Sequence, residues 1–126
     1  MKRGERGAAA VEFALVLPVL LALVFGIVEF SRAYNVQSTI SGAAREGVRV
    51  YALSNNAVEA REAVADATPA LEPGRLNVAF PSGPCPPAGG ASMPRTKVTV
   101  TYTFNFITGL LPDRVLSGTG TMRCNG

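Results

Sequence analysis

The sequence contains no histidine and no tryptophan, only two cysteines, and few charged residues. Without histidine there is no histidine-ligated metal site, no Ser-His-Asp triad and no Cys-His dyad. Charged side chains make up 17% of the 126 residues, whereas about 25% is typical of a soluble domain. An enzyme of this composition would have to work with carboxylates, Lys or Tyr alone, and the length allows one small domain.

Positive charge is concentrated at the N-terminus. Of the net charge of +3, two units lie in the first seven residues, where Lys2, Arg3 and Arg6 outnumber Glu5. Beyond this leader the basic residues are scattered singly, without the basic stripe that a nucleic-acid binder needs. We therefore expect no nucleic-acid partner.

A long apolar run follows the basic leader. Residues 8–30, AAAVEFALVLPVLLALVFGIVEF, contain only two charged residues, Glu12 and Glu29. As a helix rising about 1.5 Å per residue, this run would cross a hydrocarbon core of about 30 Å. The positive-inside rule keeps the leader cytoplasmic and puts the rest of the chain outside. The run therefore predicts a single transmembrane segment.

The same run could instead be a secretory signal peptide cut after Ala33, at Ser31-Arg32-Ala33. The run is longer than a signal-peptide core of about 7–15 residues, and Glu29 and Arg32 crowd the cleavage site. A retained anchor is therefore favoured. The alternative that stays open is a binding module released by signal peptidase after Ala33.

Glu12 is unusual because a carboxylate at membrane depth is costly unless it is paired or close to the interface. A simple interpretation is that it interacts with the positive end of the helix dipole. However, the string GAAAVEF that begins at Gly7, behind a basic leader, resembles the class III signal of type IV pilins and pseudopilins. The resemblance implies cleavage between Gly7 and Ala8 by a prepilin peptidase. It also implies that Glu12 pairs with the N-terminal amine of a neighbouring subunit.

The opening RGAAAVEFALVLPVLL and the later AAREGVR resemble TadE-like pseudopilins, minor components of the Flp (tight adherence) secretion system. The resemblance covers roughly residues 4–52. It implies a minor subunit or assembly factor of a Flp/Tad pilus in the cytoplasmic membrane. Its partners would be the peptidase, other pilin or pseudopilin subunits and the inner-membrane assembly platform. Such a protein would have no catalytic residue, cofactor, metal or small-molecule substrate.

Several positions in and after the apolar run bear on helix packing. Pro18 predicts a local kink, and Ala22 and Gly26 form a small-xxx-small pair that permits close helix contact. Glu29 can reach Arg32 at i+3, and we expect it to be a solvated boundary residue.

The helical pattern continues past the membrane segment. Small or apolar residues recur with spacings of four and three, and Gly42 and Gly47 would let another element approach closely. We therefore predict one helix from about Ala8 to Ala52, whose stripe packs on the chain's own domain or on a partner helix in an assembly. The stripe consists of Val36, Ile40, Ala43, Gly47 and Val50.

A second, short helix is predicted over residues 57–67. Asn56 followed by Glu59 is a capping-box-like start, and Pro69 ends the helix. Its inward face would be narrow and built from small residues: Ala57, Ala60, Val64, Ala67 and then Leu71.

Strand patterns fill the C-terminal half. Residues 97–106, KVTVTYTFNF, alternate regularly, and residues 76–80 and 115–124 make two further strands. We expect Gly118 and Gly120 to leave room for aromatic side chains of the neighbouring strand. Leu110 and Leu111 could form an exposed contact, although such a pair more often folds back on the core. The fold class is therefore α+β, with a long helix, a short helix and a small three-stranded antiparallel sheet.

The two cysteines fall at the same end of such a sheet. Cys85 follows the first strand and Cys124 ends the third, so a disulfide is plausible on the oxidising outer side. It would close a loop of roughly 40 residues and stabilise the domain by about 4 kcal/mol.

Carboxylates that might serve an enzyme (Asp66, Glu72 and Asp113) are far apart in sequence, so we expect no enzyme. The predicted organisation is a leader at 1–7, a transmembrane segment at 8–30, its extramembrane continuation at 31–53 and an external domain at 54–126.

Overall fold

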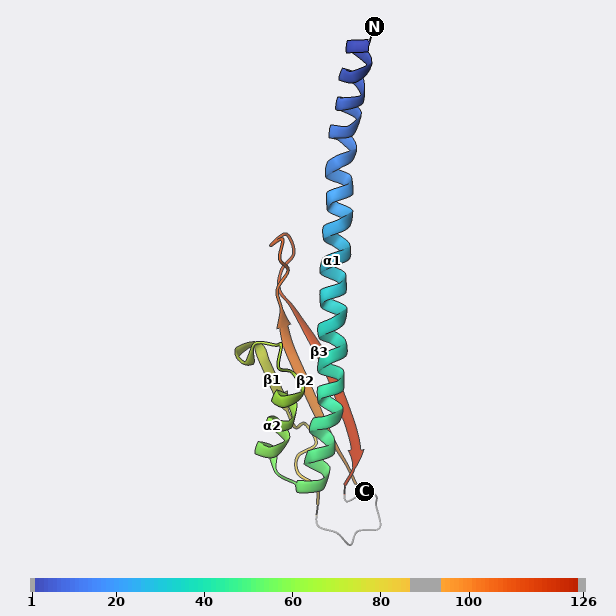
Figure 1. Cartoon of the computed structure of the whole chain (residues 1–126). Coiled ribbons are helices and arrows are strands. Elements are labelled where there is room, and N and C mark those ends of the chain that lie inside the picture. Colours follow the sequence, from blue (N-terminus) through green and yellow to red (C-terminus); the bar gives the residue numbers. More distant parts are fainter. Residues whose placement is uncertain (1, 87–93, 125–126) are drawn as a thin grey trace. The chain divides into compact units, whose positions relative to one another are not determined.

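The computed structural model describes residues 2–86 and 94–124. The chain divides into two compact units, Met1–Arg32 and Ala33–Gly126. Helix α1 (Lys2–Ser54) contributes to both units. It is followed by helix α2 (Ala57–Ala67), the 3₁₀ turn η1 (Pro73–Arg75) and strands β1 (Leu76–Ala79), β2 (Arg95–Phe104) and β3 (Arg114–Arg123) (Figure 1). The predicted α+β fold class is confirmed.

The N-terminal unit consists of the first part of α1. The helix begins at Lys2, earlier than the predicted start at Ala8, so the described leader residues are helical, and it continues through Pro18. Its large apolar side chains are exposed on every side, which is the pattern of a helix surrounded by lipid rather than water. They include Val11, Phe13, Leu15, Val19, Leu20, Leu23, Phe25 and Ile27.

The C-terminal unit contains an antiparallel sheet in the order β1-β2-β3. In the central strand every second residue is buried, from Thr96 to Phe104, as its alternating sequence predicts. The strand ends at Phe104 and not at the predicted Phe106. Phe106 still joins the core, because its ring packs edge-on against Phe104 at a centroid distance of 5.2 Å.

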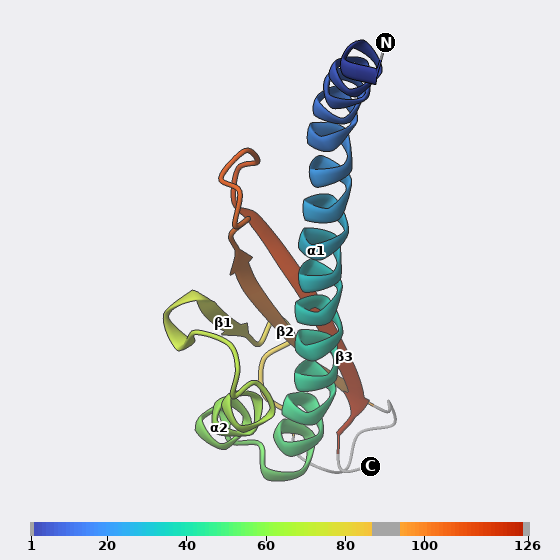
Figure 2. The same cartoon turned by 45° about the horizontal axis from the view of Figure 1, so that its top comes forward.

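Residues 33–54 of α1 cover the inner face of this sheet, as Figures 1 and 2 show. The predicted stripe therefore packs on the chain's own domain through Val36, Ile40, Ala43 and Gly47. Its last predicted member, Val50, is only half-buried and lies outside the core. The buried strip is wider than predicted, because it also includes Ala44, Val48, Tyr51 and Ala52.

Gly118 and Gly120 have a different role from the predicted one. Their cross-strand partners are Val100 and Val98 and not aromatic residues. A Cβ atom at Gly118 would lie 2.9 Å from the carbonyl carbon of Ile40, and one at Gly120 would press on the backbone of Ala44. The two glycines thus let the backbone of α1, rather than aromatic rings, approach β3.

Of Gly42 and Gly47, the two glycines of α1 that were predicted to admit another element, only Gly47 has a close neighbour. A Cβ atom there would lie 2.6 Å from Cγ2 of Val64 in α2, whereas one at Gly42 would meet nothing within 4 Å. The prediction that Gly42 admits another element is therefore wrong, because Gly42 lies on the exposed side of α1.

Helix α2 has the predicted bounds, and its start is capped by Asn56. The side-chain oxygen of Asn56 accepts a hydrogen bond from the backbone N–H of Val58 at 3.0 Å. The carboxylate of Glu59 accepts from the Asn56 side-chain amide at 3.2 Å, so the pair is a variant of the capping box. Ala67 is exposed, contrary to the predicted face, and Thr68 is buried beside it.

Candidate functional site

The first candidate site is the apolar part of α1. Within the described residues, α1 is the helix that is long and apolar enough to cross a membrane. An exposed apolar surface of this extent is unfavourable in water, since burial is worth about 25 cal/mol per Å². Lipid or partner helices would remove that cost.

The predicted processing site lies in the first turns of α1. Gly7, Ala8 and Glu12 are all exposed. Ala8 and Glu12 are four residues apart and therefore lie on one face of the helix. Among the described residues no ion pair involves Glu12, so its carboxylate is accessible to a cation from outside the chain.

The predicted packing positions of the apolar run are also open. Pro18, Ala22 and Gly26 are exposed, and a Cβ atom at Gly26 would meet nothing within 4 Å. The structure therefore leaves this small-residue face accessible to another helix.

Glu29 differs from the expected solvated residue. It is only 8% exposed, and its carboxylate forms an ion pair with Arg32 at 3.2 Å. The pairing at i+3 is as the sequence suggests, but the environment is not. A carboxylate withdrawn from water requires such a partner, because an unpaired buried charge is very costly.

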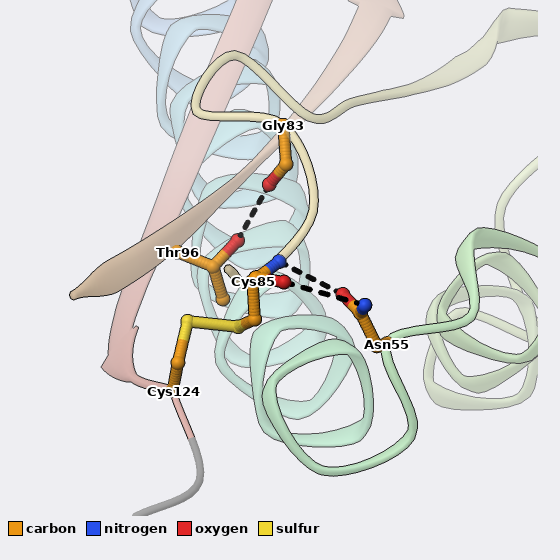
Figure 3. Close-up of a disulfide and its surroundings, with 5 residues drawn as sticks. All are labelled: Asn55, Gly83, Cys85, Thr96 and Cys124. Atoms are coloured by element: carbon orange, nitrogen blue, oxygen red, sulfur yellow. Dashed lines mark hydrogen bonds between the residues drawn. A yellow bond between two sulfur atoms is a disulfide. The ribbon is translucent and has the colours of Figure 1, made fainter. Parts of the chain in front are cut away.

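The predicted disulfide is present. Cys85 and Cys124 are bonded, and their Cα atoms lie 5.7 Å apart (Figure 3). Cys124 directly follows β3, and its backbone N–H donates to the carbonyl of Pro94 at 2.9 Å. Residues 87–93, most of the connection between Cys85 and β2, lie outside the described residues.

Asn55 is a structural residue that the sequence analysis did not identify. It ends α1 with a φ of 53°, in the left-handed region that Asn tolerates better than most residues. Its side-chain amide forms hydrogen bonds with both the backbone N–H and the backbone carbonyl of Cys85 (Figure 3). The Cys85 N–H donates to Oδ1 at 2.8 Å, and Nδ2 donates to the Cys85 carbonyl at 3.4 Å. The signal that could have identified it is an Asn between the end of one predicted helix and the cap of the next, because Asn tolerates the left-handed backbone that such a junction needs.

The loop between β2 and β3 contains a further surprise. Leu110 is 86% exposed and Leu111 is 55% exposed, so the favoured prediction that they fold back on the core is wrong and the exposed alternative holds. Ile107 in the same loop is 67% exposed. These side chains extend beyond the last β2–β3 pair, Phe104 with Arg114, where there is no core to cover them.

The carboxylates considered for catalysis are not gathered into a site. Asp66 lies in α2, Glu72 pairs with Arg75 at 3.0 Å, and Asp113 lies in the β2–β3 loop; all three are exposed. In the part of the chain that the structure describes, no group of three or more Cys, Asp or Glu side chains could hold a metal ion.

The comparison with known families matches the apolar helix and its continuation. Residues 7–49 match the family described as TadE-like protein. The chain carries a TadE-like segment. This confirms the resemblance expected from the sequence. TadE-like proteins are structural or assembly components associated with Tad pili and not enzymes. Neither the curated proteins nor the solved structures include a match to this chain.

Proposed function

We propose that this protein is a pseudopilin-like minor subunit or assembly factor of a Flp/Tad-type pilus. A prepilin peptidase cuts it after Gly7, and residues 8–30 anchor it in the cytoplasmic membrane. The N-terminus faces the cytoplasm and the C-terminal domain lies outside. Its partners are the peptidase, other pilin or pseudopilin subunits and the inner-membrane assembly platform.

The observation that carries the proposal is the position of the TadE-like match. The matched segment begins at Gly7, the residue that precedes the proposed cleavage site, and includes the whole apolar run. Its apolar side chains are exposed in the structure, as a membrane segment requires. The disulfide favours an oxidising compartment for the C-terminal unit.

Cleavage creates the charge that Glu12 needs. Hydrolysis of the Gly7–Ala8 bond leaves an α-amine on Ala8, a group that carries a positive charge when it is protonated. That amine can pair with the exposed Glu12 carboxylate of a neighbouring subunit. Two charges at membrane depth are tolerable as a pair, and the pair sets the axial register between subunits.

Substitution of Gly7 by Ala tests the processing step. We expect Gly7→Ala to remain at precursor size on an immunoblot of the producing cells. Gly4→Ala is the matched control, because a Cβ atom at either glycine meets nothing within 4 Å, so neither change disturbs packing within the chain. If both variants are processed like the wild type, cleavage after Gly7 is refuted.

Substitution of Glu12 by Gln tests the charge pair. Glu12→Gln keeps the shape of the side chain and removes its charge, so the variant should be cut normally but co-purify poorly with pilus subunits. Glu5→Gln, in the leader that cleavage removes, is the control. Unchanged co-purification of Glu12→Gln would refute the pairing.

Release by signal peptidase after Ala33 is less well supported. Helix α1 continues through Ser31, Arg32 and Ala33, and Ala33 packs against the core of the C-terminal unit. Signal peptidase instead cuts next to a short apolar core, with small residues at the site. A mature chain that begins at Tyr34 would favour this alternative.

A further inference from the structure

The β2–β3 loop, residues 105–113, presents large apolar side chains to the outside. Ile107, Leu110 and Leu111 are exposed, and no charged residue occurs in the loop before Asp113. Turns and loops are usually built from Gly, Pro, Asn, Asp and Ser. A cluster of exposed apolar side chains in such a place is typical of an interaction site.

The conformation of this loop holds the leucines outward. Asn105 at its start accepts a hydrogen bond from Arg75 at 2.8 Å, and Phe106 packs against the core residue Phe104. Gly109 has a φ of 66°, and its N–H donates to the carbonyl of Phe106 at 3.3 Å. Phe106 therefore faces the core, and the hydrogen-bonded turn from Phe106 to Gly109 directs the following residues away from it. As a result Leu110 extends into solvent.

The loop lies at the end of the C-terminal unit where the apolar run enters it. Strand β3 runs in the same direction as residues 33–54 of α1. Gln37 donates to the carbonyl of Ser117 at 2.8 Å, and Gly120 lies against Ala44 further on. The residues of β3 before Ser117 therefore lie toward Ala33, the first residue of this unit.

The lengths agree with this placement. Three strand residues, from Ser117 back to Arg114, cover about 10 Å. Four helical residues, from Gln37 back to Ala33, cover about 6 Å. The base of the loop thus reaches the level of Ala33, the first residue of the C-terminal unit. Figures 1 and 2 show the loop at the end of the sheet opposite the last residues of β3.

We propose that Ile107, Leu110 and Leu111 insert into the outer interface of the lipid bilayer that anchors the chain. This rests on membrane anchorage by residues 8–30, because the uncharged part of that run ends at Val28, only a few residues before Ala33. An inserted run therefore brings the loop-bearing end of the C-terminal unit to the bilayer surface.

Apolar residues of interfacial segments reach about 5–10 Å into the headgroup and acyl boundary. The exposed Arg114 at the loop base suits anionic headgroups. The C-terminal unit is then attached to the membrane at two points.

The absence of Trp from the sequence allows a direct test, because Leu110→Trp would carry the only indole. The full chain is reconstituted in vesicles of phosphatidylcholine and phosphatidylglycerol with or without brominated acyl chains. We expect the emission of Leu110→Trp to be blue-shifted and quenched by the brominated lipid. Thr121→Trp, on the exposed face at the far end of β3, is the matched control. Its emission should be neither blue-shifted nor quenched by the brominated lipid.

A third variant, Phe25→Trp, reports on the apolar run itself. If Phe25→Trp is quenched but Leu110→Trp behaves like Thr121→Trp, the loop proposal fails and the anchor stands. A blue shift at Leu110→Trp without quenching would mean that a protein surface, such as a second copy, covers the loop, which also overturns the proposal. If Phe25→Trp is itself unquenched, both the anchor and the loop proposal fail.

Discussion

The two parts of α1 show how one helix can be built for two different surroundings. In residues 2–32 the apolar side chains point in all directions and are exposed, whereas residues 33–54 bury one strip and leave the opposite side polar. Backbone hydrogen bonding is the same in both. What differs is the partner: the second part packs on the chain's own sheet, whereas the proposed function gives the first part lipid or another subunit.

The difference also determines where stability comes from. Among its described residues the N-terminal unit buries no apolar side chain, so in the proposed function its helix is stabilised by lipid or by another subunit. The C-terminal unit has a small core of mostly Ala and Val with a few rings, and a disulfide supplements it. Changes in the second unit should therefore alter its unfolding without altering insertion of the first, and each prediction below tests that separation.

Removal of the disulfide should have the largest effect on the C-terminal unit. Replacing both Cys85 and Cys124 by Ser opens a loop with a sequence separation of 39. Loops of this size contribute about 4 kcal/mol to the free energy of unfolding. Thermal unfolding in detergent, followed by circular dichroism, should show a lower midpoint and an unchanged residual helix signal from the apolar run. An unchanged midpoint would contradict the role of the disulfide.

The close approach of α1 to β3 should have the next largest effect. Gly120→Ala places a Cβ atom against the backbone of Ala44 and should destabilise the unit by about 1–3 kcal/mol. Gly42→Ala is the matched control on the open side of α1 and should stabilise it by up to about 1 kcal/mol. Denaturant titration measures both. Equal midpoints for the two variants would rule out the tight helix–sheet contact.

Asn55 should have a smaller effect that divides into two parts. Asn55→Ala loses two hydrogen bonds to Cys85 and puts Ala in the left-handed region, at a cost of about 1–2 kcal/mol. Asn55→Gly loses the same bonds but fits the backbone, so it should be less destabilising. Unfolding midpoints give the comparison. A larger loss for Asn55→Gly would show that backbone conformation is not part of the effect.

The ion pair of Glu46 and Arg49 on α1 should have the smallest effect. The hydrogen bond from Arg49, at 2.6 Å, and its charge lower the pKa of Glu46 below its ordinary value of 4.5. Because the folded-state pKa is lowered, the ion pair contributes its full stability above the ordinary value of 4.5 and loses it as the pH falls from there through the folded-state pKa. The small difference in unfolding midpoint between wild type and Glu46→Gln should therefore vanish at acidic pH. A difference that grows on acidification would contradict this sign.

Local signals in the sequence predicted much of this fold. Asn56 and Pro69 fix the ends of α2, and the regular alternation of residues 97–106 identifies the central strand. Each of these signals lies within a few residues of the feature that it specifies. The disulfide was predictable as well, because the strand order of a simple meander brings Cys85 and Cys124 to one end.

The predictions that failed depended on distant partners. Gly118 was expected to adjoin an aromatic ring, but its neighbour, Ile40, is far away in the sequence. Leu110 was expected in the core, because its sequence neighbours do not show that the sheet ends before it. Glu29 was expected in solvent, and only the fold shows how little of it is exposed.

The central claim is that the first part of α1 is a processed anchor and the rest is a separately stabilised external unit. The most direct test is the intact mass of the protein purified from membranes of the producing cells without reducing agent, beside cells that lack the prepilin peptidase. The account predicts a mature chain that begins at Ala8 with Cys85 and Cys124 joined, and an uncut chain in the peptidase-deficient cells. A mature chain that begins at Tyr34 in both strains would contradict it.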